Sequence, residues 1–139
     1  MKTSQVKKYL KELKDNFDKE ERKEIMQNII DDESDFEVAD YRFIHRNFID
    51  EVMKDELLSD TYVLGCCNSW FIAEIIDLDC DIIEKAQKDE NFTLLGELMA
   101  KNIEEVQEKM VSYDGYGHHF GHYDGNENEV EDYYYFRVN

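Results

Sequence analysis

Three of the four histidines lie close together near the C-terminus, at His118, His119 and His122, and Asp124 follows two residues later. Imidazole and carboxylate groups can bind a transition metal, and they can also donate and accept protons near neutral pH. The segment therefore has the residue types of a small metal-dependent or His/Asp-based hydrolase. We keep that activity as the alternative function.

The glycines of this segment argue against a shared metal site. Gly117 and Gly121 disfavour a helix, which would place residues four apart on one face. In an extended strand, residues four apart stand roughly 13 Å apart, too far to share one ion. A metal would need a tight loop or further ligands such as Cys67 or Cys80. We expect the histidines to make structural hydrogen bonds, and we predict no metal and no cofactor.

Two acidic stretches match only the first half of a calcium-binding loop. The first is Asp77–Asp81, where Ile82 occupies the position that requires glycine and Lys88 the position of the bidentate glutamate. The second begins at Asp124 and fails in the same way, with Glu129 at the glycine position. Helix caps and solvated acidic loops are the better interpretation.

The cysteines show no signature of reactivity. Cys66 and Cys67 are adjacent in an apolar run and have no basic neighbour that would lower the pKa of a thiol, so we predict that they pack in the core. The sequence contains no glycine-rich phosphate loop, nucleophile elbow or paired-histidine zinc helix. We assign no catalytic residue, and these patterns favour a binding protein over an enzyme.

Charge is the strongest compositional signal. The 34 Asp and Glu residues face 16 Lys and Arg, giving a net charge of −18 and an isoelectric point near 4.4. Residues 1–30 carry eight basic and six acidic residues, so residues 31–139 carry −20. Such a chain does not favour nonspecific binding to nucleic acid or to an anionic membrane, because both require clustered basic residues.

The acidity belongs to segments that we expect to be folded. No Lys or Arg occurs from Asp55 to Glu84, or from Met110 to Phe136. From these two stretches we predict a partner-binding set of eight acidic residues: Asp55, Glu56, Asp60, Asp77, Asp79, Asp81, Glu127 and Glu129.

Apolar spacing predicts a mainly α fold. The chain has no proline and six glycines, which favours long helices. We expect a first helix along Val6, Leu10, Leu13 and Phe17, capped by Thr3 or Ser4. Further helices are predicted from a capping box at Asp18 and Glu21, from Ile44 to Leu58, around Asp81–Ala86, and from Asn91 or Thr93 to Met110.

The run from Thr61 to Ile76 is apolar nearly all round, so we predict a central and most buried helix there, with Trp70 and Phe71 in the core. A buried strand is the competing interpretation. Phe36 and Val38 alternate with acidic residues and suggest a short extended piece.

The C-terminal part predicts a β-hairpin. Asp124-Gly125-Asn126 is a strong turn signal between aromatic runs, and Tyr133–Phe136 supplies one strand. These four aromatic residues can dock on the protein's own helices or on a partner. We predict one compact helical domain of five to six helices plus this hairpin, over residues 1–139, with parts 1–30, 40–111 and 113–139.

No segment reads as a targeting or membrane signal. The first residues open directly into a lysine-rich amphipathic pattern, and no window approaches 18 uninterrupted apolar residues. We expect a cytoplasmic protein.

The segment from Asp114 to Glu127, Asp-Gly-Tyr-Gly-His-His-Phe-Gly-His-Tyr-Asp-Gly-Asn-Glu, resembles the C-terminal motif of small acidic proteins of phages and mobile elements. Similarity extends to Tyr62–Cys66 and Trp70–Ala73, so it covers roughly residues 40 to 139. The resemblance implies a phage setting, in which small acidic proteins include inhibitors of restriction and CRISPR enzymes. Some of these imitate DNA by holding carboxylates where phosphates would lie.

Charge and resemblance together predict an acidic binding module. Its expected partner is a basic nucleic-acid-binding protein such as a defence nuclease, in the cytoplasm of the host cell. The rival interpretation is that the charge only aids solubility.

Overall fold

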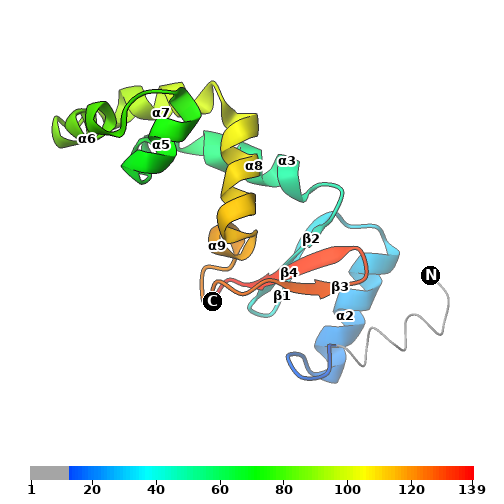
Figure 1. Ribbon diagram of the computed structural model, residues 1–139. Coiled ribbons are helices and arrows are strands. Elements are labelled where there is room, and N and C mark those ends of the chain that lie inside the picture. Colours follow the sequence, from blue (N-terminus) through cyan, green and yellow to red (C-terminus); the bar gives the residue numbers. More distant parts are fainter. Residues whose placement is uncertain (1–12) are drawn as a thin grey trace. The chain divides into compact units, whose positions relative to one another are not determined.

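A computed structural model describes residues 13–139 (Figure 1). The predicted mainly α fold with a C-terminal antiparallel hairpin is confirmed: the described residues hold eight helices, more than the five to six predicted. Contacts group these residues into two compact units. Of the described residues, unit 1 contains 13–49 and 114–139, and unit 2 contains Asp50–Tyr113.

The first helix among the described residues of unit 1 is α2, Lys19–Ile30. The predicted capping box is present: Asp18 accepts a hydrogen bond from the backbone N–H of Glu21 at 2.8 Å, and Glu21 accepts one from Asp18 N–H at 2.9 Å. Ile25, Met26 and Ile29 form the buried face of α2. The helix predicted along Val6 and Leu10, with its cap at Thr3 or Ser4, lies outside the described residues.

A four-stranded antiparallel sheet completes unit 1. It is built from two hairpins in the order β1-β2-β4-β3, with bounds β1 Asp35–Val38, β2 Tyr41–His45, β3 Asn128–Val130 and β4 Tyr133–Arg137. The sequence predicted the second hairpin and only an extended piece for the first. Ile44 was assigned wrongly to a helix: it lies in β2, and α3 begins at Ile49.

The second hairpin turns at a different place from the predicted one. Its turn is Glu131–Asp132, with Glu131 in the left-handed region at φ 53°. Asp124 instead accepts a hydrogen bond from Asn126 N–H at 2.9 Å, in the loop before β3. The Asp-Gly signal thus marks a real turn, but this turn does not join the two strands.

Aromatic rings fill the space between α2 and the sheet. Phe43 is fully buried and stacks on Phe36 and on Tyr135, with ring centroids 4.9 and 5.0 Å apart. Tyr133 and Tyr135 of β4 are buried in the same cluster, whereas Phe136 points to the other face of the sheet and is buried against Phe120, with ring centroids 5.2 Å apart. Three of the four aromatic residues at 133–136 therefore pack within the protein itself, as the first of the two predicted roles requires, and Tyr134 is half-buried.

Tyr133 should make stability sensitive to alkaline pH. Its hydroxyl donates to the carbonyl oxygen of Glu33 at 2.6 Å, and burial, followed by the charges of Asp32, Glu33 and Asp132, raises the pKa of this phenol. A raised pKa contributes stability that is complete below the unfolded value, about 10, and is lost as the pH rises through the folded value.

Tyr133→Phe should therefore lower the free energy of unfolding by about 1 kcal/mol near pH 7, the usual net worth of such a hydrogen bond. The difference from the wild type should shrink as the pH rises above about 10. Urea unfolding of both proteins across this range measures it. A difference that stays constant with pH would contradict the assignment.

Unit 2 is helical throughout. Its elements are α3 Ile49–Ser59, α4 Thr61–Gly65, α5 Ser69–Ile76, α6 Cys80–Lys88, α7 Phe92–Ala100 and α8 Ile103–Asp114, of which Ile49 and Asp114 already belong to unit 1. Its core contains Leu64, Ile72, Ile83, Leu95, Met99 and Val106. The predicted stripe from Leu95 to Met110 is present, but it is divided between α7 and α8.

The predicted central helix 61–76 is wrong in two respects. The helix is interrupted between α4 and α5. There the Gln87 side chain donates hydrogen bonds to the carbonyl oxygens of Gly65 and Cys67. The segment is also buried on one side only. Leu64, Phe71, Ile72 and Ile75 are buried, whereas Tyr62, Val63, Cys66 and Trp70 are exposed.

Candidate functional site

Unit 2 carries most of the charge of the chain. Residues 50–113 contain 16 acidic and five basic residues, a net charge of −11 out of −18. Six of the eight predicted partner-binding residues lie in this unit, and the remaining two, Glu127 and Glu129, lie in unit 1. The candidate site is therefore the acidic surface of unit 2.

The six acidic residues sit at helix ends and on one helix surface. Asp55 and Glu56 are in the second half of α3, and Asp60 is the N-cap residue of α4. Asp77 follows α5 in the left-handed conformation at φ 57°, Asp79 is the N-cap residue of α6, and Asp81 lies in its first turn. All are exposed except Glu56, which is half-buried.

Five of these carboxylates are not neutralised by neighbours. Within residues 13–139, the side chains of Asp55, Asp60, Asp77, Asp79 and Asp81 form no ion pair and no hydrogen bond. Asp60 and Asp79 occupy N-cap positions without making the capping hydrogen bond. Their charge is therefore directed to solvent.

Two of the five basic side chains of unit 2, Lys54 and Lys109, pair with other acidic residues. Lys54 is nearly buried, and its ammonium donates to Glu51 at 2.6 Å and to Glu104 at 2.9 Å. These two hydrogen bonds hold the pKa of Lys54 well above its usual range. Lys109 donates to Glu74 at 2.6 Å. Neither lysine contacts the five unpaired carboxylates.

The two predicted residues of unit 1 differ from each other. Glu127 accepts a hydrogen bond from the backbone N–H of Tyr116 at 3.3 Å, so it holds the start of the glycine-histidine segment. Glu129 is exposed on β3. Glu127 therefore has a structural role that its sequence position did not reveal.

The histidine segment adopts a structure that we did not expect. Gly117–Phe120 forms a short helix, α9, although its first residue is a glycine and Gly121 directly follows it. Gly117 is required there for space, because a Cβ atom at this position would lie 2.2 Å from the carbonyl oxygen of Gly125. The prediction that the glycines disfavour a helix here was wrong, since Gly117 serves a close backbone approach.

The histidines themselves do not converge. His118 and His122 are exposed, and His119 is half-buried against the Phe120 ring, with centroids 4.6 Å apart. Over residues 13–139, no three or more His, Cys, Asp or Glu side chains are grouped so as to hold a metal ion. The Asp124 carboxylate is engaged in its own turn.

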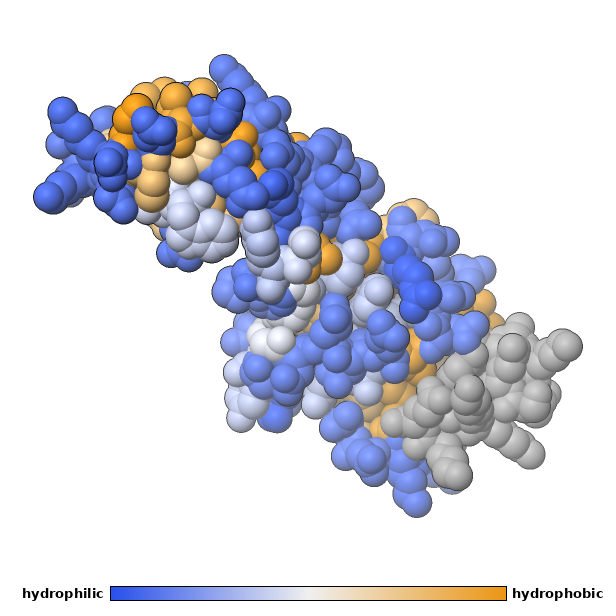
Figure 2. Space-filling model, viewed as in Figure 1, coloured by the Kyte–Doolittle hydropathy of each residue, from blue (hydrophilic) through white to orange (hydrophobic). Residues whose placement is uncertain are grey.

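The acidic surface of unit 2 is interspersed with exposed apolar side chains. Figure 2 shows hydrophobic surface among hydrophilic residues where α6 and α7 lie. Leu78 stands between Asp77 and Asp79, and Ile82 follows Asp81. Eight large apolar residues of this unit are exposed: Leu58, Tyr62, Val63, Trp70, Leu78, Ile82, Leu94 and Tyr113.

One cluster on this surface was missed by the sequence analysis. Trp70 of α5 and Tyr113 of α8 meet edge to face, with ring centroids 5.5 Å apart. The Tyr113 hydroxyl donates to Glu74, which also accepts from Lys109. The spacing Trp70–Glu74 and Lys109–Tyr113, four residues in each helix, is the sequence signal for this cluster, but Trp70 had been assigned to the core.

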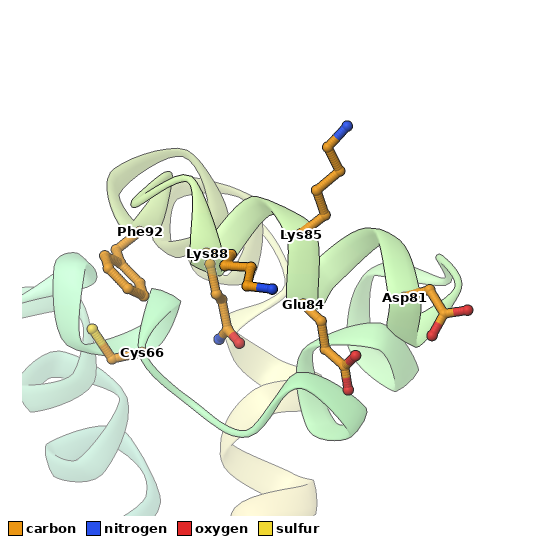
Figure 3. A pocket seen from close by; sticks show the side chains of 7 residues that line it. Cys66, Asp81, Glu84, Lys85, Lys88 and Phe92 are labelled. Carbon is orange, nitrogen blue, oxygen red and sulfur yellow. The ribbon is translucent and has the colours of Figure 1, made fainter.

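A depression lies beside α6 on unit 2 (Figure 3). Its lining residues are Cys66, Asp81, Glu84, Lys85, Gln87, Lys88 and Phe92. Cys66 and Phe92 face each other at one end, whereas Asp81 and Lys85 point away from it. These side chains do not converge as a catalytic group would need to.

Comparison with known proteins found no family model, curated protein or solved structure that matches the chain. Among residues 13–139, the helices are too short or too polar to cross a membrane. The geometry of unit 2 thus supplies the main support for a functional assignment.

Proposed function

We propose that this chain is an acidic binding module that engages a basic, nucleic-acid-handling protein through unit 2. The observation that carries the proposal is the set of exposed carboxylates without ion pairs: Asp55, Asp60, Asp77, Asp79 and Asp81. In such a complex these carboxylates take positions that nucleic-acid phosphates would otherwise occupy, so the protein competes with DNA or RNA.

Stability does not explain these charges. Exposed ion pairs are worth at most about 1 kcal/mol, and these five residues form none within the described residues. Like charges at high density repel one another and oppose the compact state. Charge of this kind contributes free energy only when an oppositely charged surface approaches it, where it steers and orients the encounter.

The exposed apolar residues favour binding over a purely solubilising role. Leu78 and Ile82 alternate with acidic residues around the start of α6. A surface that served only solubility would gain nothing from exposed leucine and isoleucine. An interface uses both, because charge brings the partner in and apolar contact holds it.

The class of partner follows from charge and from the resemblance to phage proteins. A basic channel built for nucleic acid is the natural complement of a unit with net charge −11. The resemblance of residues 114–127 to small acidic phage proteins supports a role as an anti-CRISPR or antirestriction inhibitor in the host cytoplasm. The partner is then a defence nuclease.

Neutralising the unpaired carboxylates should abolish binding while leaving the fold intact. Asparagine keeps the shape of aspartate, serves well as an N-cap residue at 60 and 79, and tolerates the left-handed backbone at 77. In the test, wild type and a variant with Asn at 55, 60, 77, 79 and 81 are immobilised and exposed to a bacterial lysate. We expect the wild type to retain basic nucleic-acid-binding proteins that soluble duplex DNA and high salt release.

The matched control removes five acidic charges from unit 1 instead, at Asp15, Glu24, Glu37, Asp40 and Asp132. Both variants lose five negative charges, so they are matched in net charge. The control should retain the same proteins as the wild type, because its unit 2 carboxylates are intact. Equal loss in both variants would reduce the effect to net charge. Retention by the unit 2 variant, or retained proteins that DNA cannot displace, would refute the proposal.

A further inference from the structure

We propose that Trp70 and Tyr113, held by Glu74 and Lys109, form an anchor that binds an arginine side chain of the basic partner protein. We call these four residues the α5–α8 anchor. The inference rests on the proposed function, because it specifies how unit 2 recognises a basic protein. It adds a definite chemical preference, for guanidinium over ammonium, that charge alone does not give.

The two rings of the anchor are exposed to solvent on one side and rest on a buried ring on the other. Trp70 and Tyr113 are each 51% exposed, although both are large aromatic residues. Phe71 is buried and contacts both, with ring centroids 5.8 Å from Trp70 and 6.3 Å from Tyr113. Exposed, well-supported Trp and Tyr side chains are the residue types that most often dominate binding energy in protein interfaces.

Tyr113 is fixed in place before any partner arrives. Its hydroxyl donates to Glu74, with both carboxylate oxygens at 2.9 Å, and the Lys109 ammonium lies 2.6 Å from the same carboxylate. The hydrogen bonds from Lys109 and then Tyr113 lower the pKa of Glu74, which keeps the carboxylate ionised at neutral pH. A ring held in this way loses little conformational entropy on binding.

The charges around the anchor select a cation. Besides Glu74, Asp77 directly follows the end of α5, and Glu105 on α8 lies 3.9 Å from Lys109. Since Lys109 already pairs with Glu74, an incoming cation is drawn by the remaining charge of unit 2 and meets the aromatic faces. Nucleic-acid bases, which also stack on aromatic rings, are disfavoured because their phosphates are repelled by a unit of net charge −11.

Aromatic faces distinguish the two basic side chains. A guanidinium group is planar and weakly hydrated, so it stacks on Trp and Tyr more readily than the strongly hydrated ammonium of lysine. Each such contact at an exposed site is worth about 0.5–1 kcal/mol, which corresponds to about a two- to fivefold change in affinity.

The test uses two synthetic peptides of equal length and charge, one of alternating arginine and serine and one of alternating lysine and serine. Isothermal titration calorimetry at low salt measures their binding to the full chain. We expect the wild type to bind the arginine peptide more tightly than the lysine peptide, by up to about fivefold. Trp70→Ala should remove this preference, and Trp70→Phe should keep part of it.

Leu94→Ala is the matched control, because Leu94 is an apolar residue of unit 2 that is 56% exposed and lies outside the anchor. It should keep the arginine preference. Equal affinity of the wild type for both peptides, or a preference that survives Trp70→Ala, would overturn the anchor and leave the proposed function standing. If neither peptide bound the wild type or the variant neutralised at five positions, the five carboxylates would have no effect on binding to a basic chain. The proposed function itself would then fail.

Discussion

Gly96→Ala should destabilise unit 2 by about 3 kcal/mol or more, although alanine is the better helix former. A Cβ atom on Gly96 would lie 1.9 Å from the carbonyl oxygen of Thr61, and one on Gly65 would lie 1.9 Å from that of Phe92. Helices α4 and α7 thus cross with their backbones in direct contact. A methyl group must force them apart, which opens the core around Leu64 and Leu95.

The sign of the stability change in Gly96→Ala distinguishes a close crossing of α4 and α7 from an ordinary exposed helix. In an exposed helix, Gly→Ala stabilises by up to about 1 kcal/mol. Hydrogen exchange of the amides of α4 and α7, with urea unfolding, measures the change. Glu97→Ala is the control, because Glu97 is the exposed neighbour on the same helix and should change stability by less than about 0.5 kcal/mol. A neutral or stabilising Gly96→Ala would mean that the helices do not cross so closely.

Phe43→Ala should destabilise unit 1 by about 3–5 kcal/mol, the usual cost of removing a buried phenylalanine. Phe43 is fully buried between Phe36 and Tyr135 and also lies 5.8 Å from the Phe17 ring, so its removal leaves a cavity that three rings border. Relaxation around stacked rings is limited, which places the expected loss in the upper part of this range.

Thermal unfolding followed by near-ultraviolet circular dichroism of the aromatic residues measures the loss. Phe48→Ala is the control, because Phe48 follows β2 closely but is 50% exposed and contacts the His45 ring only at its edge. It should change stability by less than about 1 kcal/mol. Comparable losses in both variants would contradict the burial of Phe43.

The two stability predictions also bear on the functional tests. Gly96→Ala disturbs the unit that carries the unpaired carboxylates and the α5–α8 anchor, whereas Phe43→Ala acts on unit 1. Binding that survives Phe43→Ala and fails in Gly96→Ala would therefore support unit 2 as the binding unit. Binding that fails only in Phe43→Ala would point to the sheet and to Glu129 instead.

Local signals in the sequence were sufficient where the physics is local. The capping box of Asp18 and Glu21 was predicted because its two hydrogen bonds join residues three apart. The concentration of acidic residues in segments without lysine or arginine needed no structure either. The mainly α character followed from the absence of proline and from apolar spacing.

Contacts between residues far apart in the sequence account for the predictions that were wrong. The run 61–76 is apolar nearly all round, and spacing alone does not say which side is buried: α4 crosses α7 at Gly65 and Gly96, and α5 buries Phe71, Ile72 and Ile75 while Trp70 stays exposed. At the helix Gly117–Phe120, the backbone of Gly125, eight residues beyond Gly117, packs so close to Gly117 that no side chain fits there. The sequence shows which residues are apolar, and their spacing indicates which helices can form. Which of those residues are buried depends on contacts between segments far apart in the sequence. Only the tertiary structure brings these segments together.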